Sequence, residues 1–68
     1  MITFEPTGDY IELCNLLKVC GPCLSGGEAK VAIQSGLVKV DGATETRKKC
    51  KIRKGSVVSF EAHSIQVK

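Results

Sequence analysis

The first half of the chain carries apolar side chains at the three- and four-residue spacing of an α-helix. Thr7-Gly8-Asp9 predicts the start of a first helix, with Asp9 as its N-cap and Glu12 completing a pair that resembles a capping box. Gly21-Pro22 predicts its end, because glycine adopts the left-handed cap and proline cannot continue a helix. The residues expected to face the core from this helix are Tyr10, Leu13, Cys14 and Leu17.

A second helix is predicted directly afterwards. Ser25 and Glu28 have the spacing of the S-x-x-E capping box, and Gly36 is the expected stop. The buried stripe of this helix is predicted to consist of Ala29, Ala32 and Ile33. Because the connection between the two helices is short, we expect them to pack against each other.

After Gly36 the pattern changes to the two-residue alternation of β-strands. Predicted strands cover residues 37–40, 46–53, 56–60 and 64–67, and residues 2–4 are a candidate edge strand. They are separated by turns at Asp41-Gly42, Lys54-Gly55 and residues 61–63. This order predicts an α+β fold in which two packed N-terminal helices precede a small, mostly antiparallel sheet.

The length of the chain limits what it can do. A chain of 68 residues is expected to form one domain over residues 1–68, and it buries only roughly 60% of its unfolded surface. Such a thin core leaves little room for a catalytic cleft, so we expect no enzymatic activity, no cofactor and no small-molecule substrate. No apolar run approaches the ~18 residues of a membrane span, and the N-terminus does not have the pattern of a secretion signal. We therefore expect a cytoplasmic protein with reduced cysteines.

Positive charge is concentrated in one stretch. Six of the ten cations fall within eight positions that contain no acidic residue: Arg47, Lys48, Lys49, Lys51, Arg53 and Lys54. The rest of the chain, with four cations and seven acids, carries −3. If the stretch is a strand, Arg47, Lys49, Lys51 and Arg53 point outward at spacings of roughly 6.6 Å, with Cys50 and Ile52 inward. Such a row suits a phosphate backbone, although a solvated basic face without a partner remains the alternative. A membrane partner is not expected, because no amphipathic helix with large apolar residues accompanies the cations.

The start of the second helix is another candidate anion site. Free backbone amides and the helix dipole favour an anion there, and Lys30 follows one turn later. Gly26 and Gly27 each cost up to about 1 kcal/mol of helix propensity relative to alanine, which close approach of a ligand to the backbone would explain. A frayed first turn is the other explanation.

The cysteines allow three interpretations. Cys20-Gly-Pro-Cys23 has the spelling of a thioredoxin-type dithiol, and the helix start after Cys23 is expected to lower its thiol pKa. The motif follows a helix, however, and not the strand of a βαβ unit. A zinc site would combine Cys20, Cys23 and Cys14 with Cys50 or His63, but Cys14 and Cys50 have the pattern of core residues and His63 that of a surface turn. Structural cysteines without redox or metal function are the favoured interpretation.

Aromatic residues are few. Phe4, Tyr10 and Phe60 are the only ones, and at least two of them are expected in the core. Modules that bind single-stranded nucleic acid stack the bases on exposed aromatic side chains. The chain therefore favours a structured RNA recognised through its shape and phosphates. A basic adaptor that binds an acidic protein is a weaker alternative.

Four segments together resemble a known family: the first helix with Leu13, Leu16, Leu17 and Lys18, the helix start Ser25-Gly-Gly-Glu-Ala29-Lys30, the stretch from Gly36 to Gly42, and Lys54-Gly55-Ser56-Val57-Val58. This family is the RNA-binding domain first defined in ribosomal small-subunit protein S4, also called the alpha-L motif. The resemblance covers about residues 10–60, is most specific from Gly36 to Gly42, and is closest to the small stand-alone bacterial members.

The resemblance implies binding to structured RNA, ribosomal or transfer RNA in particular, and association with the ribosome. In the family, the second helix and the loop and strand after it face the RNA. The interface expected here consists of Ser25, Gly26, Gly27, Lys30, Lys39, Arg47, Lys48, Lys49, Lys51, Arg53 and Lys54. Gly26 departs from the family, which usually has a basic residue directly after the serine, and this shifts weight onto the basic strand. Cys20-Gly-Pro-Cys23 is not part of the family pattern.

Overall fold

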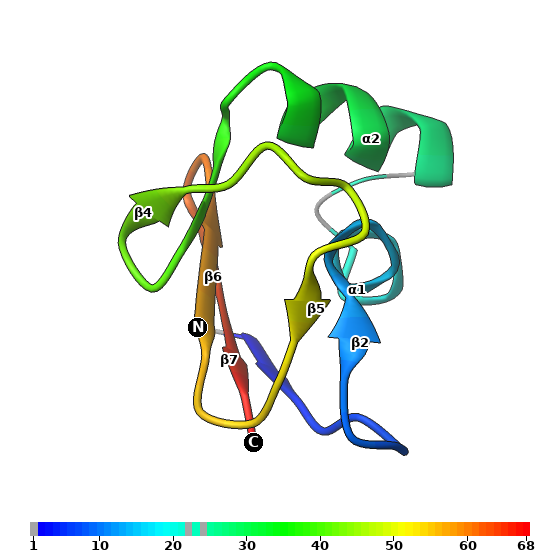
Figure 1. Ribbon diagram of the computed structural model, residues 1–68, viewed down its shortest axis with the longest axis vertical. Helices are drawn as coiled ribbons and strands as arrows, with labels where there is room; N and C mark the ends of the chain where they lie inside the picture. The colour runs from blue at the N-terminus through cyan, green and yellow to red at the C-terminus, as the bar shows by residue number, and fades with distance from the viewer. Residues whose placement is uncertain (1, 22, 24) are drawn as a thin grey trace.

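The computed structural model describes residues 2–21, 23 and 25–68 (Figure 1). The elements are, in chain order, β1 (Ile2–Phe4), β2 (Ile11–Glu12), α1 (Leu13–Val19), α2 (Gly26–Gln34), β3 (Val38–Val40), β4 (Ala43–Thr44), β5 (Lys51–Ile52), β6 (Val57–Phe60) and β7 (His63–Val67). The α+β class and the mostly antiparallel sheet are confirmed. The candidate edge strand over residues 2–4 is confirmed as β1, but β2 was not predicted, so the description of two N-terminal helices ahead of the sheet is not quite right.

Five strands form the main sheet, in the order β1-β7-β6-β3-β4. β1 lies at one edge and runs parallel to β7, whereas every other neighbouring pair in this sheet is antiparallel. The predicted turn between β3 and β4 is confirmed: Asp41 and Gly42 have φ angles of +52° and +85°, as a type I′ hairpin turn requires. The turn into β7 is shorter than predicted, since His63 already belongs to the strand.

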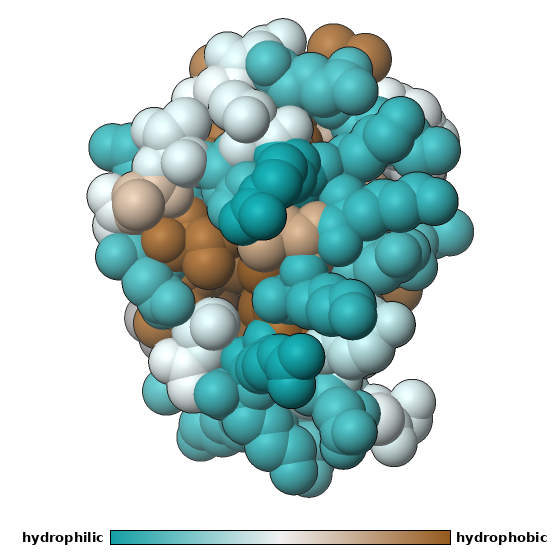
Figure 2. Space-filling view, viewed as in Figure 1, coloured by the Kyte–Doolittle hydropathy of each residue, from teal (hydrophilic) through white to brown (hydrophobic). Residues whose placement is uncertain are grey.

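β2 and β5 form a separate two-stranded ribbon, in which Ile11 pairs with Ile52 and Glu12 with Lys51. In Figure 1 this ribbon lies on the same side of the main sheet as α1, and the loop that leads into β5 runs across the front. Seen from the same side, hydrophilic side chains cover that loop and β5, whereas a hydrophobic area remains uncovered toward β6 (Figure 2).

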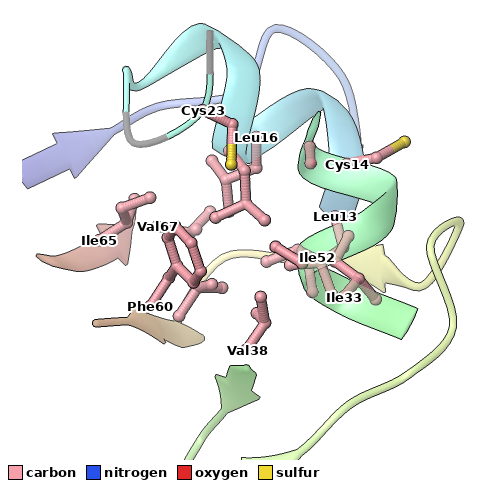
Figure 3. Packing of buried hydrophobic residues seen from close by; sticks show 14 residues of the cluster. Leu13, Cys14, Leu16, Cys23, Ile33, Val38, Ile52, Phe60, Ile65 and Val67 are labelled. Atoms are coloured by element: carbon pink, nitrogen blue, oxygen red, sulfur yellow. The ribbon is translucent and has the colours of Figure 1, made fainter. Parts of the chain in front are cut away.

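The core lies between one face of the main sheet and the two helices (Figure 3). Strand alternation explains which side chains the sheet contributes to the core. Val38 in β3 and Val58 and Phe60 in β6 are buried, whereas Lys39, the residue after Val38, points away and is exposed. The buried residues contributed by the helices are Leu13, Cys14, Leu16 and Leu17 from α1 and Ala29, Ala32 and Ile33 from α2. Ile52 closes the core from the ribbon.

The first helix begins three residues later than predicted, because its N-cap is Glu12 and not Asp9. Residues 11 and 12 pair with β5, so the chain there is extended, and Glu12 is the N-cap without a side-chain cap bond. Tyr10 consequently lies outside the helix and is exposed, contrary to its predicted place in the core. The pairing partner is about 40 positions away, which a local capping pattern does not show. Pro22, which formed part of the predicted helix end, lies outside the described residues.

The second helix is confirmed. The Ser25 hydroxyl accepts a hydrogen bond from the Glu28 backbone N–H at 3.2 Å, which is one of the two bonds of a capping box. The helix ends at Gln34, and Gly36 follows with φ +79°, a left-handed conformation that favours glycine. These determinants lie within the helix and its caps, which is why the sequence alone defines it well.

Candidate nucleic-acid interface

The basic segment, residues 47–54, is two turns joined by a short strand and not the continuous strand predicted over residues 46–53. Residues 47–50 form a turn closed by a hydrogen bond from Cys50 N to Arg47 O at 3.1 Å. Residues 53–56 form another, closed from Ser56 N to Arg53 O at 3.2 Å. Only Lys51 and Ile52 are paired, because β2 offers two residues before the chain enters α1. The straight row of four cations is therefore wrong.

Backbone carbonyl groups of the segment hold it against the start of α1. Leu13 N donates to Cys50 O at 2.9 Å, and Cys14 N donates to Lys48 O at 3.1 Å. These amides belong to the first turn of α1, where a helix provides no acceptor of its own. The segment thus takes the place of the missing side-chain cap. Because the carbonyls of Lys48 and Cys50 are bound to α1, the backbone of the turn at residues 47–50 is held against the body of the protein.

The side chains of the segment alternate between inside and outside, as predicted, although the backbone is not a continuous strand. Ile52 is only 1% exposed and Cys50 packs partly against the core, whereas Lys49, Lys51 and Arg53 are exposed. The side chains of the first turn and of β5 border an open hollow of about 460 Å³, whose lining residues are Arg47, Lys49, Cys50 and Lys51. Three cations consequently surround one concave surface.

Glu45, just before the segment, ties down Arg47. Its carboxylate accepts hydrogen bonds from Arg47 Nε at 3.0 Å, from Nη2 at 3.2 Å and from the backbone N at 3.0 Å. These bonds, from the side chain first and then from the backbone, lower the pKa of the Glu45 carboxyl to about 2. The Arg47 side chain nevertheless remains 77% exposed, so its outer surface still faces solvent.

The two ends of the segment lie apart. Gly55 N donates to Val67 O at 2.8 Å, which places the second turn at the C-terminal end of β7. Arg53 and Lys54 are exposed in that turn, at the opposite end of β5 from Lys48 and its contact with α1. In Figure 1 the two turns lie at the upper and lower ends of β5, and Figure 2 shows hydrophilic side chains along this line. The cations thus lie along one face of the molecule as two groups.

The start of α2 is open to solvent. An added Cβ at Gly26 would meet nothing within 4 Å, and one at Gly27 would meet only the Ser25 hydroxyl, at 3.9 Å. Internal packing therefore does not require glycine at either position. Lys30 is exposed one turn later. Within the described residues no hydrogen bond joins the start of α2 to the basic segment. Both α2 and the basic segment contact α1, which lies between them in the contact network.

Lys39 lies elsewhere. It sits in β3 between Val38, which is buried, and Val40, which packs against the core, so its side chain points to the opposite face of the sheet. It is paired with Thr44 on one side and Ser59 on the other. The structure therefore does not bring Lys39 to the hollow that Arg47, Lys49 and Lys51 surround.

Tyr10 is a residue that the sequence did not single out for the interface. Its side chain is 42% exposed, and Lys51 Nζ lies 5.0 Å from the centre of its ring, a cation–π distance. The contact depends on the pairing of β2 with β5, which has no local signature. A basic side chain that borders the hollow thus also covers an exposed aromatic ring.

The cysteines do not have the properties of a reactive dithiol. All four are free thiols. Burial, with smaller effects of the Glu28 and Glu61 carboxylates, raises the pKa of Cys23, and burial raises the pKa of Cys20. The expectation that the helix start lowers the Cys23 pKa is therefore wrong. The described residues contain no group of three or more His, Cys, Asp or Glu side chains arranged to hold a metal ion.

None of the described helices has both the length and the apolar character needed to cross a membrane.

Comparisons with known proteins agree on one family. The family model described as "S4 domain" matches residues 4–68. The Escherichia coli (strain K12) protein named "Putative RNA-binding protein YbcJ" is 60% identical over 58 residues, which cover 85% of this chain and 83% of that protein, and the Shigella flexneri protein "Uncharacterized protein YbcJ" matches to the same extent. A solution structure of YbcJ from E. coli, reported to reveal an "alfaL motif involved in RNA-binding", superposes with a TM-score of 0.75 at 56% identity, covering 98% of this chain and 86% of that one.

Proposed function

The chain belongs to the S4 domain family, and from this premise we propose that it binds structured RNA, ribosomal or transfer RNA in particular, through phosphate contacts of the basic segment. The observation that carries the proposal is the ordered turn at residues 47–50 of the basic segment. The carbonyls of Lys48 and Cys50 accept hydrogen bonds from α1, and cationic side chains border an open concave surface beside the turn. Because the backbone is already ordered, less conformational entropy is lost when a phosphate binds.

The shape of the segment favours a folded RNA over a flexible strand. Its two cationic groups, around Lys49 and around Lys54, lie at opposite ends of β5 on one face of the protein. A helical RNA presents rows of phosphates at fixed positions, so two separated groups can contact it together. Phosphate contacts position an RNA without specifying its sequence, in agreement with the scarcity of exposed aromatic side chains.

The start of α2 is proposed as a second contact. Ser25, Gly26 and Gly27 leave the backbone open to approach, and Lys30 adds a charge one turn later. Gly26 stands where the family usually has a basic residue, so this contact is expected to contribute less than the basic segment. Lys39, on the other face of the sheet, belongs to the proposed interface only if the RNA extends around the edge at β4.

Charge reversal at both ends of the segment tests the proposal. The double variant Lys49→Glu/Arg53→Glu leaves Arg47 bound to Glu45 and Lys51 in place. Its control is Lys18→Glu, a charge reversal at an exposed position on α1 outside the proposed interface, which is compared with the single variant Lys49→Glu of equal charge change. Binding to ribosomal RNA fragments and transfer RNA is measured across a series of salt concentrations.

The first variant is expected to lose most of its affinity, and the slope of log K against log salt to flatten by about 0.7–0.9 for each lost phosphate contact. The control should keep the slope of the unaltered protein. Thermal unfolding of both variants shows whether they are folded, and Lys49→Gln/Arg53→Gln provides a milder version. Equal losses in the variant and the control would contradict the proposal. Sequencing of RNA that co-purifies with the tagged protein then identifies the RNA class.

A further inference from the structure

Tyr10 differs from the other aromatic residues in its exposure. Phe60 is 7% exposed and Phe4 packs partly against the core, whereas Tyr10 is 42% exposed. Tyr10 precedes β2 directly, and it contributes nothing to the buried cluster. An exposed aromatic ring next to cationic side chains therefore calls for an explanation other than packing.

The register of the β2–β5 ribbon explains where the ring lies. Ile11 and Ile52 are paired and face the core, so the paired Glu12 and Lys51 face outward. Tyr10 is two positions before Glu12 and thus shares this outer face, diagonally across from Lys51. This diagonal relation brings Lys51 Nζ to 5.0 Å from the ring centre. In Figure 1 the two strands lie side by side beneath α1.

The neighbouring bonds keep this arrangement in place. Leu13 N donates to Cys50 O at 2.9 Å, which continues the pairing of the ribbon into the first residue of α1. Ile52, almost completely buried, anchors the other strand in the core. The ring of Tyr10 and the amino group of Lys51 are thus presented by two short strands that are both attached to the body of the protein.

The Glu12 carboxylate on this outer face disfavours a phosphate directly over the ring. Glu12 is paired with Lys51, and Arg53 is exposed on the same side, so the face around Tyr10 carries one anion and two cations. A phosphate placed there would meet a carboxylate. The hollow on the other side of Lys51 is bordered by Arg47 and Lys49 and suits a phosphate instead. Lys51 belongs to both surfaces, so an aromatic position and a phosphate position are neighbours.

We propose that Tyr10 stacks on an unpaired base of the RNA, while Arg47, Lys49 and Lys51 hold the adjoining phosphate in the hollow. The inference rests on the proposed RNA binding and makes it more specific: the ligand is a folded RNA with an unpaired or bulged nucleotide beside a helical stem. Base–aromatic stacking tolerates any base, because every base has a π-face. The ring thus recognises an unpaired base without selecting its sequence.

The composition of the chain provides a direct probe. Tyr10 is the only tyrosine and there is no tryptophan, so tyrosine fluorescence reports on this residue alone. Two synthetic RNA hairpins are compared, identical except that one carries a single bulged adenosine in its stem. The bulged hairpin is expected to quench Tyr10 fluorescence and to bind more tightly than the fully paired hairpin.

Substitutions complete the experiment. Tyr10→Ala is expected to weaken binding of the bulged hairpin by about 5- to 150-fold and to leave binding of the paired hairpin unchanged. Tyr10→Phe keeps the ring and should bind both hairpins like the unaltered protein, whereas Tyr10→Leu, similar in bulk but without a ring, should behave like Tyr10→Ala. Thermal unfolding confirms that each variant is folded.

The outcomes separate this inference from the proposed function. If both hairpins bind with equal affinity, or if both or neither quench the fluorescence, base stacking is refuted although RNA binding stands. If neither hairpin nor any other folded RNA binds, the proposed function itself is refuted. A loss of affinity for both hairpins in Tyr10→Ala would also contradict base stacking, because the ring would then act without an unpaired base.

Discussion

The carboxylate of Glu45 receives three hydrogen bonds from one residue, Arg47: one from its backbone N–H and two from its guanidinium group. The pair closes the loop immediately before the first turn of the basic segment. Glu45 N in addition donates to Val38 O at 3.0 Å, which attaches this loop to β3. Arg47 thus orders the loop through Glu45 as well as presenting positive charge at the hollow.

The titration of Glu45 follows from this pair. Its pKa in the folded protein, about 2, lies below the ordinary value of 4.5, because the Arg47 bonds require the ionised carboxylate. The stability that the pair contributes is therefore complete above pH 4.5 and is lost as the pH falls toward 2. An NMR titration of the glutamate carboxyl carbons should give Glu45 a midpoint near 2, and Arg47→Gln should return it toward 4.5. A midpoint near 4.5 in the unaltered protein would show that the pair does not form in solution.

Ile52 should be the most sensitive position of the basic segment. Ile52→Ala is expected to reduce the free energy of unfolding by about 2–5 kcal/mol, because it leaves a cavity where β5 enters the core. Val31→Ala, at an exposed apolar position on α2, should change it by no more than about 0.5 kcal/mol. Urea unfolding measures both. Similar effects of the two substitutions would mean that β5 is not anchored as described.

Two substitutions at Ser25, the N-cap of α2, distinguish its structural role from a role in RNA binding. Ser25→Ala removes the acceptor of the Glu28 amide and should cost about 1 kcal/mol of stability. Ser25→Asp keeps a capping oxygen but adds a negative charge, so stability should be retained while RNA affinity falls. Chemical denaturation and RNA binding are measured on both variants. Full affinity in Ser25→Asp would remove the helix start from the interface.

The thiols should react slowly at neutral pH. Burial raises the pKa of Cys20 and Cys23, and the thiolate is the reactive form. Rates of alkylation by iodoacetamide, measured against pH on variants that keep one of these two cysteines, should give apparent pKa values above the ordinary value of 9.0. N-acetylcysteine is the control. An apparent pKa near or below 7 at either thiol would revive the redox alternative.

Local signals allowed parts of this fold to be predicted from the sequence. The second helix is defined by Ser25, Glu28 and Gly36, all within or beside it, and the β3–β4 hairpin by Asp41-Gly42. The first helix start was misplaced because Asp9 and Glu12 have capping spacing, while Glu12 actually pairs with Lys51. Long-range pairing decided the conformation there, and a sequence pattern does not contain it.

The candidate site shows the same division. Alternation correctly separated the exposed Lys51 and Arg53 from the buried Ile52, since burial follows the apolar pattern even where the backbone turns. It could not reveal that the first turn folds back onto α1, nor that Glu45 holds Arg47. The exposure of Tyr10 was missed because it depends on which residues pair with β5.

Amide chemical-shift mapping by NMR, with a folded RNA added to the labelled protein, tests the central claim most directly. We expect the largest changes in the basic segment, residues 47–54, with smaller ones from Ser25 to Lys30 and little change in β1, the edge strand that pairs with β7. Changes confined to β1 and β7, with residues 47–54 unaffected at saturating RNA, would contradict the account.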